Sequence, residues 1–187
     1  MKAALLVVGV LILVALIAGA SFMSTRNDLV TEQQAVRGQF SQVDVVMQRR
    51  ADLIPNLVET VKGFAKQEQA VFGAIAQARA QMAGAHTPQE KIDANNQLSG
   101  ALGRLLVVTE NYPQLRSSEH FQTLMTELER SENRINIERR KYNEVVQKYN
   151  TDLQLFPKNI VAGLFGFQPE PYFKADEAAK VVPKVAF

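Results

Sequence analysis

The pattern of apolar positions divides the chain into an unbroken apolar run at its start and a body in which apolar residues recur periodically. Residues 3–20 carry no charged or strongly polar side chain, and Phe22 extends the run past Ser21. Because a helix of about 20 apolar residues spans the hydrocarbon layer of a bilayer, the run predicts one N-terminal transmembrane anchor. The alternative is a cleaved signal peptide, since Lys2 precedes the run and residues 18–20 resemble a cleavage site. The run is longer than the apolar region of a signal peptide, which favours the anchor.

The charges that flank the run are nearly symmetric. Lys2 precedes it, whereas Arg26 and Arg37 follow it among the acidic residues Asp28 and Glu32. Counting Lys and Arg alone therefore leaves orientation almost undecided. A short N-terminus before a signal-like anchor favours export of the body, so we expect the body on the extracytoplasmic side.

From Val36 onward, apolar residues recur in alternating steps of four and three. This seam comprises Val36, Phe40, Val43, Met47, Arg50, Ile54, Leu57, Val61, Phe64, Glu68, Val71 and Ile75. Such spacing keeps one stripe of a helix facing a partner, as in bundles and coiled coils. It predicts a helix over residues 27–83, about 85 Å long. Pro55 removes a backbone donor inside that helix, so a kink or a restart is expected near residues 50–54, and the pattern leaves both open.

A second helix is marked by its start signal. Thr87 is a capping residue, Pro88 suits the first helical position and Glu90 completes a capping box. The helix is expected to run to about Asn111, where Pro113 stops it. Its apolar positions are Ile92, Leu98, Leu102, Leu105 and Leu106.

A third helix is expected between a cap at Ser117 or Ser118 and Pro157. Its seam comprises Phe121, Leu124, Leu128, Ser131, Ile135, Glu138, Tyr142, Val145, Tyr149 and Leu153. Because the links between these helices are short, they predict an up-down-up antiparallel arrangement.

These elements predict an all-α protein: an N-terminal transmembrane helix followed by an antiparallel bundle of long helices. We expect the anchor and its flank over residues 1–26, the bundle over residues 27–157 and a tail over residues 158–187. The tail combines an apolar segment with a short helix over residues 174–182. An up-down-up bundle places this tail at the end away from the anchor.

Composition narrows the function classes. The formal net charge of +2 offers no basic excess for neutralising phosphates, so nucleic-acid binding is not expected. The absence of cysteine excludes disulfides, thiolate catalysis and sulfur-ligated metals. With no Trp and few Gly or Pro, the body has the composition of a helical protein.

Several strings in the body resemble the LemA family. Residues 49–58 read Arg-Arg-Ala-Asp-Leu-Ile-Pro-Asn-Leu-Val, and residues 60–65 read Thr-Val-Lys-Gly-Phe-Ala. Further matches are Leu105, Leu106, Glu110, Asn111, Tyr112, Pro113, Phe121, Leu124, Glu132, Arg139, Arg140, Lys141, Tyr142, Asn143, Tyr149 and Asn150. The resemblance covers nearly the whole chain and implies a membrane-anchored, all-helical bacterial protein of the inner membrane, with no established enzymatic activity. Some relatives take part in shaping magnetosome membranes, and the family supplies no agreed catalytic residues.

Residues with catalytic or metal-binding chemistry are sparse. His86 and His120 have no local partners at zinc-ligand spacing, so we expect two solvated surface histidines. Phosphate-loop and nucleophile-elbow motifs are absent from the sequence. We therefore expect neither an enzyme nor a cofactor or metal site.

Charged residues inside the apolar seams are more informative. Arg50, Glu68 and Glu138 interrupt the seams, and a buried charge without a partner is costly. They predict an ionic layer between the first and third helices, formed by Arg49, Arg50, Asp52, Glu68, Glu138 and Arg139. The alternative is that the seam slips at Pro55 and these charges point outward.

The apolar segment of the tail is a second candidate site. Its residues Ile160, Val161, Leu164, Phe165 and Phe167 would form a sizeable apolar patch if exposed. Such a patch is expected to dock on a neighbouring subunit or to dip into a membrane surface. Alternatively, the segment folds back and closes the open end of its own bundle.

A self-associating scaffold is favoured by the anchor, by the long apolar seams and by the lack of a recognisable set of catalytic residues. We expect a homo-oligomer that organises a bacterial membrane region or recruits other membrane proteins there. The alternative is a module of the cell envelope that senses a ligand or a protein between its helices, which requires a pocket with convergent polar groups.

Overall fold

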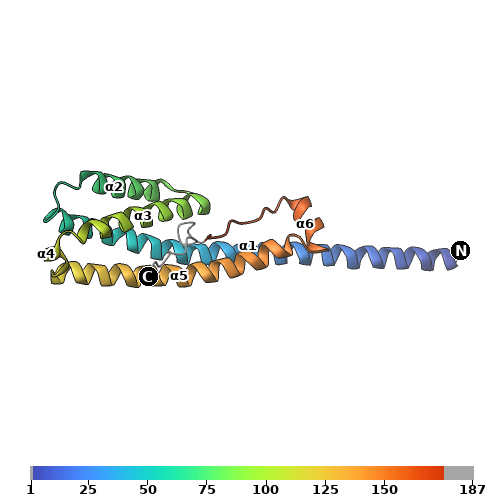
Figure 1. The fold of residues 1–187 in the computed structure, drawn as a ribbon. Helices are drawn as coiled ribbons and strands as arrows, with labels where there is room; N and C mark the ends of the chain where they lie inside the picture. Colours follow the sequence, from blue (N-terminus) through green and yellow to red (C-terminus); the bar gives the residue numbers. More distant parts are fainter. Residues whose placement is uncertain (1, 175–187) are drawn as a thin grey trace, which may run out of the picture. The chain divides into compact units, whose positions relative to one another are not determined.

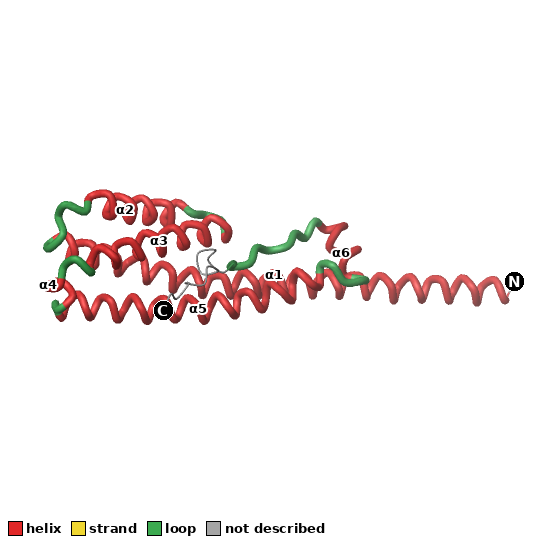
Figure 2. Tube along the Cα trace, in the orientation of Figure 1, coloured by secondary structure: helices red, strands yellow, loops and turns green. Residues whose placement is uncertain are grey.

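The computed structural model describes residues 2–174, with side chains from Leu5 onward, and confirms the all-α fold: these residues form helices and no strand. The helices are α1 (Lys2–Lys62), α2 (Gln69–Gly84), α3 (Pro88–Thr109), α4 (Pro113–Arg116), α5 (Glu119–Asp152) and α6 (Lys158–Phe165) (Figures 1 and 2). The short helix expected over residues 174–182 falls beyond the described part of the chain.

The chain divides into two compact units. Of the described residues, the anchor unit comprises 2–39 and 143–170, and the bundle unit comprises 40–142 and 171–174. Helices α1 and α5 each contribute a segment to both units.

Helix α1 passes through Pro55 without a break, which excludes the restart that the sequence left open beside a kink near residues 50–54. Ile54 and Leu57, on either side of the proline, are fully buried, and this packing holds the helical path across the missing hydrogen bond. The interruption comes later, between Lys62 and Gln69, where Phe64 and Ala65 both donate backbone hydrogen bonds to the Val61 carbonyl. The single helix expected over residues 27–83 is therefore two helices.

Because of this extra break, the bundle unit has four long helical segments instead of three. The segments from α1, α2, α3 and α5 run in alternating directions (Figure 1). Antiparallel packing is as expected, but the chain reverses once more than an up-down-up arrangement does.

Burial follows the predicted seams closely. Along α5, the seam residues from Phe121 to Tyr142 are buried as expected, and the seam then shifts by one residue from Val145 to Val146. Along α1, burial follows the seam to Val61. Beyond it, Phe64 is 43% exposed and Ala65 is buried in its place, because the helix has already ended.

The start of α3 is the predicted capping box. The Thr87 hydroxyl accepts a hydrogen bond from the Glu90 backbone N–H at 3.2 Å. In return the Glu90 carboxylate accepts from the backbone N–H groups of His86, at 2.8 Å, and Thr87, at 3.1 Å. These hydrogen bonds lower the pKa of Glu90, and the bond from the His86 N–H contributes most. They also hold the turn between α2 and α3.

The anchor unit has a small apolar core of its own. Leu29 of α1 packs with Val161 and Ala162 of α6, and the partly buried Phe22, Leu153 and Phe167 surround them. The tail segment therefore lies beside the helix that carries the apolar run. Its expected position away from the anchor is wrong, because that expectation followed from three alternating helices rather than four.

Candidate functional site

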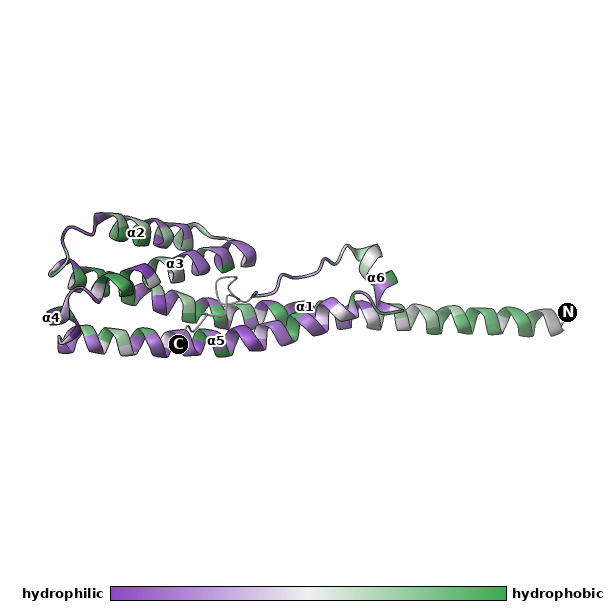
Figure 3. Ribbon diagram, in the orientation of Figure 1, coloured by the Kyte–Doolittle hydropathy of each residue, from purple (hydrophilic) through white to green (hydrophobic). Residues whose placement is uncertain are grey.

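The apolar run leaves its side chains uncovered. Among the described residues, one helix, α1, contains a stretch long and apolar enough to cross a membrane, beginning at Leu5. From Leu5 to Ile17 its large side chains are 52–72% exposed. Figure 3 shows the N-terminal part of α1 as a continuous hydrophobic stretch. An uninterrupted apolar surface of this length matches the hydrocarbon layer of a bilayer, which makes residues 5–22 the candidate span.

Helix α6 has one buried and one exposed apolar face. Val161 and Ala162 point into the core against Leu29. Ile160 and Leu164, one turn apart, remain 58% and 70% exposed. Of the predicted contact residues, Val161 is therefore buried in the internal core and Phe167 is half-buried. The other three, Ile160, Leu164 and Phe165, are exposed.

Aromatic contacts join the end of α6 to the end of the candidate span. The rings of Phe165 and Phe22 lie 5.8 Å apart between centroids. The Arg26 guanidinium carbon lies 5.1 Å from the centroid of the Phe165 ring, within the range of a cation–π contact. Gly166, with φ of 72°, then ends the helix in a left-handed conformation that favours glycine.

An ionic network joins the other end of α6 to α1 and α5. Lys158 of α6 contacts the carboxylates of Glu32 at 3.0 Å and Asp152 at 2.5 Å. Lys148 of α5 pairs with the same two carboxylates. The hydrogen bond from Lys158 is the main cause that lowers the pKa of Asp152 to about 2. The network holds the three helices together at the start of α6.

Asn150 fixes the segment that follows α6. Its side-chain amide donates to the Glu170 carbonyl at 2.8 Å and accepts from the Glu170 N–H at 2.9 Å. This paired contact satisfies a buried amide and holds the backbone of the tail against α5. From the sequence, Asn150 is a match to the LemA family without an assigned role. Its position directly after the seam residue Tyr149 is the signal that could have predicted a buried polar contact.

In the bundle unit, Tyr142 makes a corresponding contact. Its hydroxyl donates to the Pro171 carbonyl at 3.0 Å, and its ring meets those of Phe40, at 5.5 Å, and Phe173, at 5.3 Å. Arg139 lies 4.6 Å above the Phe173 ring. These contacts were not predicted, because the partners are more than 25 residues apart in sequence and only the folded tail brings them together.

Within the predicted ionic layer, the shortest ion pair between α1 and α5 joins the buried Arg50 to Glu132, whose side chain is 36% exposed. Arg50 is 7% exposed and lies 2.7 Å from a carboxylate oxygen of Glu132. It also donates a hydrogen bond of 2.9 Å to the Ser99 hydroxyl of α3. Burial lowers the pKa of Arg50, and the Glu132 charge opposes that shift. Arg50 thus connects the three helices α1, α3 and α5. Its partner Glu132 was recognised in the sequence only as a match to the LemA family.

The other members of that layer lie elsewhere. Arg49 is exposed and 3.9 Å from Glu127, while Asp52 accepts a hydrogen bond from Gln48 within α1. Glu138 is buried and pairs with Arg134 and Lys141 of its own helix, and Arg139 donates to Asn96 of α3. Glu68 lies in the turn between α1 and α2. The contacts of these residues thus differ, and a single inter-helix layer that joins all six of them stays a prediction.

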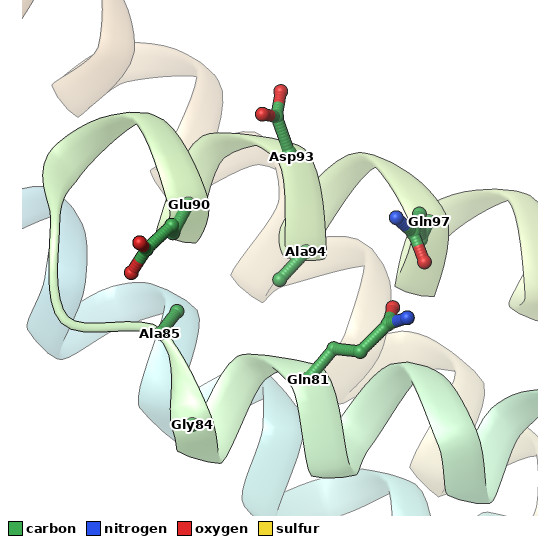
Figure 4. Close-up of a pocket in the computed structure, with 7 residues that line it drawn as sticks. All are labelled: Gln81, Gly84, Ala85, Glu90, Asp93, Ala94 and Gln97. Carbon is green, nitrogen blue, oxygen red and sulfur yellow. The ribbon is translucent and has the colours of Figure 1, made fainter.

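Several grooves mark the bundle surface, and two of them bear on the predicted polar residues. The larger, about 520 Å³, lies between α1 and α5 and is lined by Gln42, Val45, Val46, Arg49, Glu127, Arg130, Ser131, Arg134 and Glu138. The smaller, about 350 Å³, lies at the α2–α3 turn and is lined by the residues that Figure 4 labels. Its Glu90 carboxylate is already engaged by the capping box and Asp93 points away, so the polar groups left to the smaller groove are the amides of Gln81 and Gln97.

The described residues bring no three His, Asp or Glu side chains together at metal-binding distances. His86 and His120 are exposed, as expected. The side chains that do come together form ion pairs and apolar contacts between helices.

These features define a class of protein: an all-α bundle whose first helix carries a candidate membrane span. More specifically, the chain belongs to the LemA family, with which residues 39–187 match. The resemblance found in the strings of α1, α3 and α5 is thereby confirmed.

Characterised relatives extend the comparison. Magnetosome protein MamQ 2 of Paramagnetospirillum magneticum is 29% identical over 201 residues, covering 94% of this chain and 73% of the relative. Magnetosome protein MamQ of Magnetospirillum gryphiswaldense is 27% identical, covering 90% and 71%. Protein LemA of Metamycoplasma hominis is 22% identical, covering 86% and 74%. With the candidate span, these similarities fit a membrane-associated protein of the single-pass type.

Proposed function

We propose that this protein is a self-associating helical scaffold, anchored in the bacterial inner membrane with its bundle on the periplasmic side. It organises a membrane region or recruits other membrane proteins, and it acts neither as an enzyme nor as a nucleic-acid binder. The magnetosome relatives support a role tied to a membrane compartment.

The observation that carries the proposal is the character of the groove between α1 and α5. Val45 is 66% exposed at its rim, although it lies on a helix whose opposite stripe is fully packed. Both signs of charge line the groove: Arg49, Arg130, Arg134, Glu127 and Glu138. In a two-fold dimer the same patch meets itself, so a patch that carries both signs is self-complementary, whereas a patch of one sign repels its copy.

Anchoring adds to this complementarity. Proteins confined to one membrane share an orientation and a thin layer, which raises their effective concentration relative to free solution. A modest apolar contact at Val45, surrounded by charge pairs, is then sufficient for assembly. The occupant of the groove is a second copy of this chain.

The test is the mass of full-length protein in mild detergent, measured by light scattering. We expect a defined oligomer for the unchanged chain and a monomer for Val45→Glu, which places a charge at the centre of the contact. Val107→Glu is the matched control, since Val107 of α3 is 64% exposed and lies outside the groove. This variant is expected to keep the oligomer.

Other outcomes decide against the scaffold. A monomer for the unchanged chain removes self-association and favours the alternative, a binding module of the cell envelope. An oligomer that survives Val45→Glu but not Val107→Glu places the contact on another face.

A further inference from the structure

We propose that the exposed face of α6 is a membrane-contact surface, whose C-terminal end inserts into the interfacial region of the bilayer that holds α1. The face consists of Ile160, Leu164 and the exposed edge of Phe165. The partner is the acyl-chain boundary of the lipid bilayer. The inference uses only the anchor unit and does not depend on self-association of the bundle.

The contacts of α6 lead along α1 toward the span. At the start of α6, Lys158 contacts Glu32. One turn later Val161 packs on Leu29. At the end of α6, Phe165 meets Arg26 and Phe22. Each step along α6 therefore moves the contact closer to the apolar run of α1.

Phe22 lies at the end of that run, where only Met23 follows it before Ser24. Residues 3–22 rise by about 30 Å as a helix, which equals the thickness of the hydrocarbon layer. When the run spans the bilayer, Phe22 lies at the boundary of the acyl chains. Because Phe165 packs on Phe22, the end of α6 lies at that boundary as well.

The polarity of α6 agrees with this placement. Its first residue, Lys158, is bound to Glu32 and Asp152, where the charges remain in water or in ion pairs. Its last turn carries the apolar residues Leu164, 70% exposed, and Phe165, 43% exposed. A short helix with an apolar face at a membrane boundary gains free energy by inserting that face among the acyl chains. In water the same side chains would remain an uncovered patch beside a membrane surface.

Continuity with the span selects lipid over a protein partner. The exposed side chains of α1 up to Ile17, the half-buried Phe22 and the end of α6 form one succession of apolar groups in the anchor unit. Lipid already has to cover the first part of this succession. The same bilayer covers the last part without any further component.

Tryptophan fluorescence in vesicles tests the proposal, because the chain contains no tryptophan of its own. Full-length Leu164→Trp is reconstituted in phosphatidylcholine vesicles, with and without lipids brominated on their acyl chains. The matched control is Phe156→Trp, since Phe156 is 80% exposed but precedes the polar start of α6. We expect brominated lipid to quench Leu164→Trp at least twofold more strongly than Phe156→Trp.

A second tryptophan variant tests whether the quenching of Leu164→Trp is caused by the substitution itself. Ile160→Trp lies one turn earlier on the same face, where Ile160 is 58% exposed. Its quenching is expected to fall between those of the other two variants, because it lies farther from Phe22 than Leu164 does.

Two results overturn the proposal. Water-like emission without quenching for both Leu164→Trp and Ile160→Trp shows that the face remains in solvent. Blue-shifted emission that brominated lipid does not quench, and that reverts when the protein is diluted with lipid, shows that a second copy covers the face.

Discussion

The two units hold their peripheral helices by different means. In the bundle unit, α3 buries a regular stripe against its neighbours, and Ile92, Leu98 and Leu105 are 0–3% exposed. In the anchor unit, α6 buries only Val161 and Ala162, and ionic contacts and an aromatic contact complete its attachment. The bundle unit is therefore stabilised chiefly by apolar burial, although Leu106 and Val107 near the end of α3 remain exposed. Helix α6 is held by few contacts, and its apolar side chains Ile160 and Leu164 remain exposed for contact with lipid.

The largest test of this difference removes apolar volume from each core. Leu57→Ala in the bundle unit, where Leu57 is fully buried, is expected to lower the free energy of unfolding by about 3 kcal/mol. Val161→Ala is expected to cost about 1 kcal/mol and to act mainly on α6. Urea unfolding of the detergent-solubilised protein measures the first effect, and hydrogen exchange of the α6 amides measures the second. Equal losses of global stability would contradict the distinction.

A smaller effect is expected from the ion pair between the buried Arg50 and the partly exposed Glu132. Arg50→Ala leaves Glu132 and Ser99 without their partner and should lower the free energy of unfolding by about 2 kcal/mol. Arg49→Ala is the control and should change it by less than about 0.5 kcal/mol, because Arg49 is exposed and 3.9 Å from Glu127. Arg50→Met retains much of the apolar stem and should recover part of the loss. Identical melting curves for Arg50→Ala and the unchanged chain would contradict the role of this pair.

The smallest expected effect is the pH dependence of the α6 network. The pKa of Asp152 is about 2 in the folded protein against an ordinary value of 3.8, so its ionised form favours the folded state. The stabilisation is complete above about pH 4 and is lost as the pH falls through about 2. Acid should therefore lower the hydrogen-exchange protection of the α6 amides, relative to their intrinsic exchange rate at each pH, before that of the α3 amides in this window.

Asp152→Asn removes the titrating group and provides the control. This variant should show fast exchange in α6 already at pH 5 and little further change on acidification. Parallel acceleration in α3 and α6 in both proteins would assign the acid effect to general unfolding.

Much of the fold was predictable because it depends on local periodicity. Along α5 the predicted seam matches the buried residues from Phe121 to Tyr142, and the capping box places the start of α3 correctly. Errors arose where neighbours override local preference. Pro55 is tolerated because Ile54 and Leu57 are packed on both sides, and the helix ends instead at Lys62. The extra reversal that follows places the tail segment beside the anchor.

The candidate sites were predictable only in part for the same reason. A charge in a seam identified Arg50 as a buried residue, but its partner Glu132 depends on the rotation of α5 against α1. Similarly, the apolar tail was recognisable from its composition. Which of its side chains pack inward, as Val161 does, and which remain exposed, as Leu164 does, depends on the surface that α6 meets.

By itself, the sequence determined the all-α class, the apolar run, the seams and the family, since each is carried by residue types and spacings a few positions apart. Only the tertiary structure decided the number of chain reversals, the partner of Arg50 and the contact between Phe165 and Phe22. These features join residues more than 75 positions apart, and their geometry is set by how whole helices rotate and slide against one another.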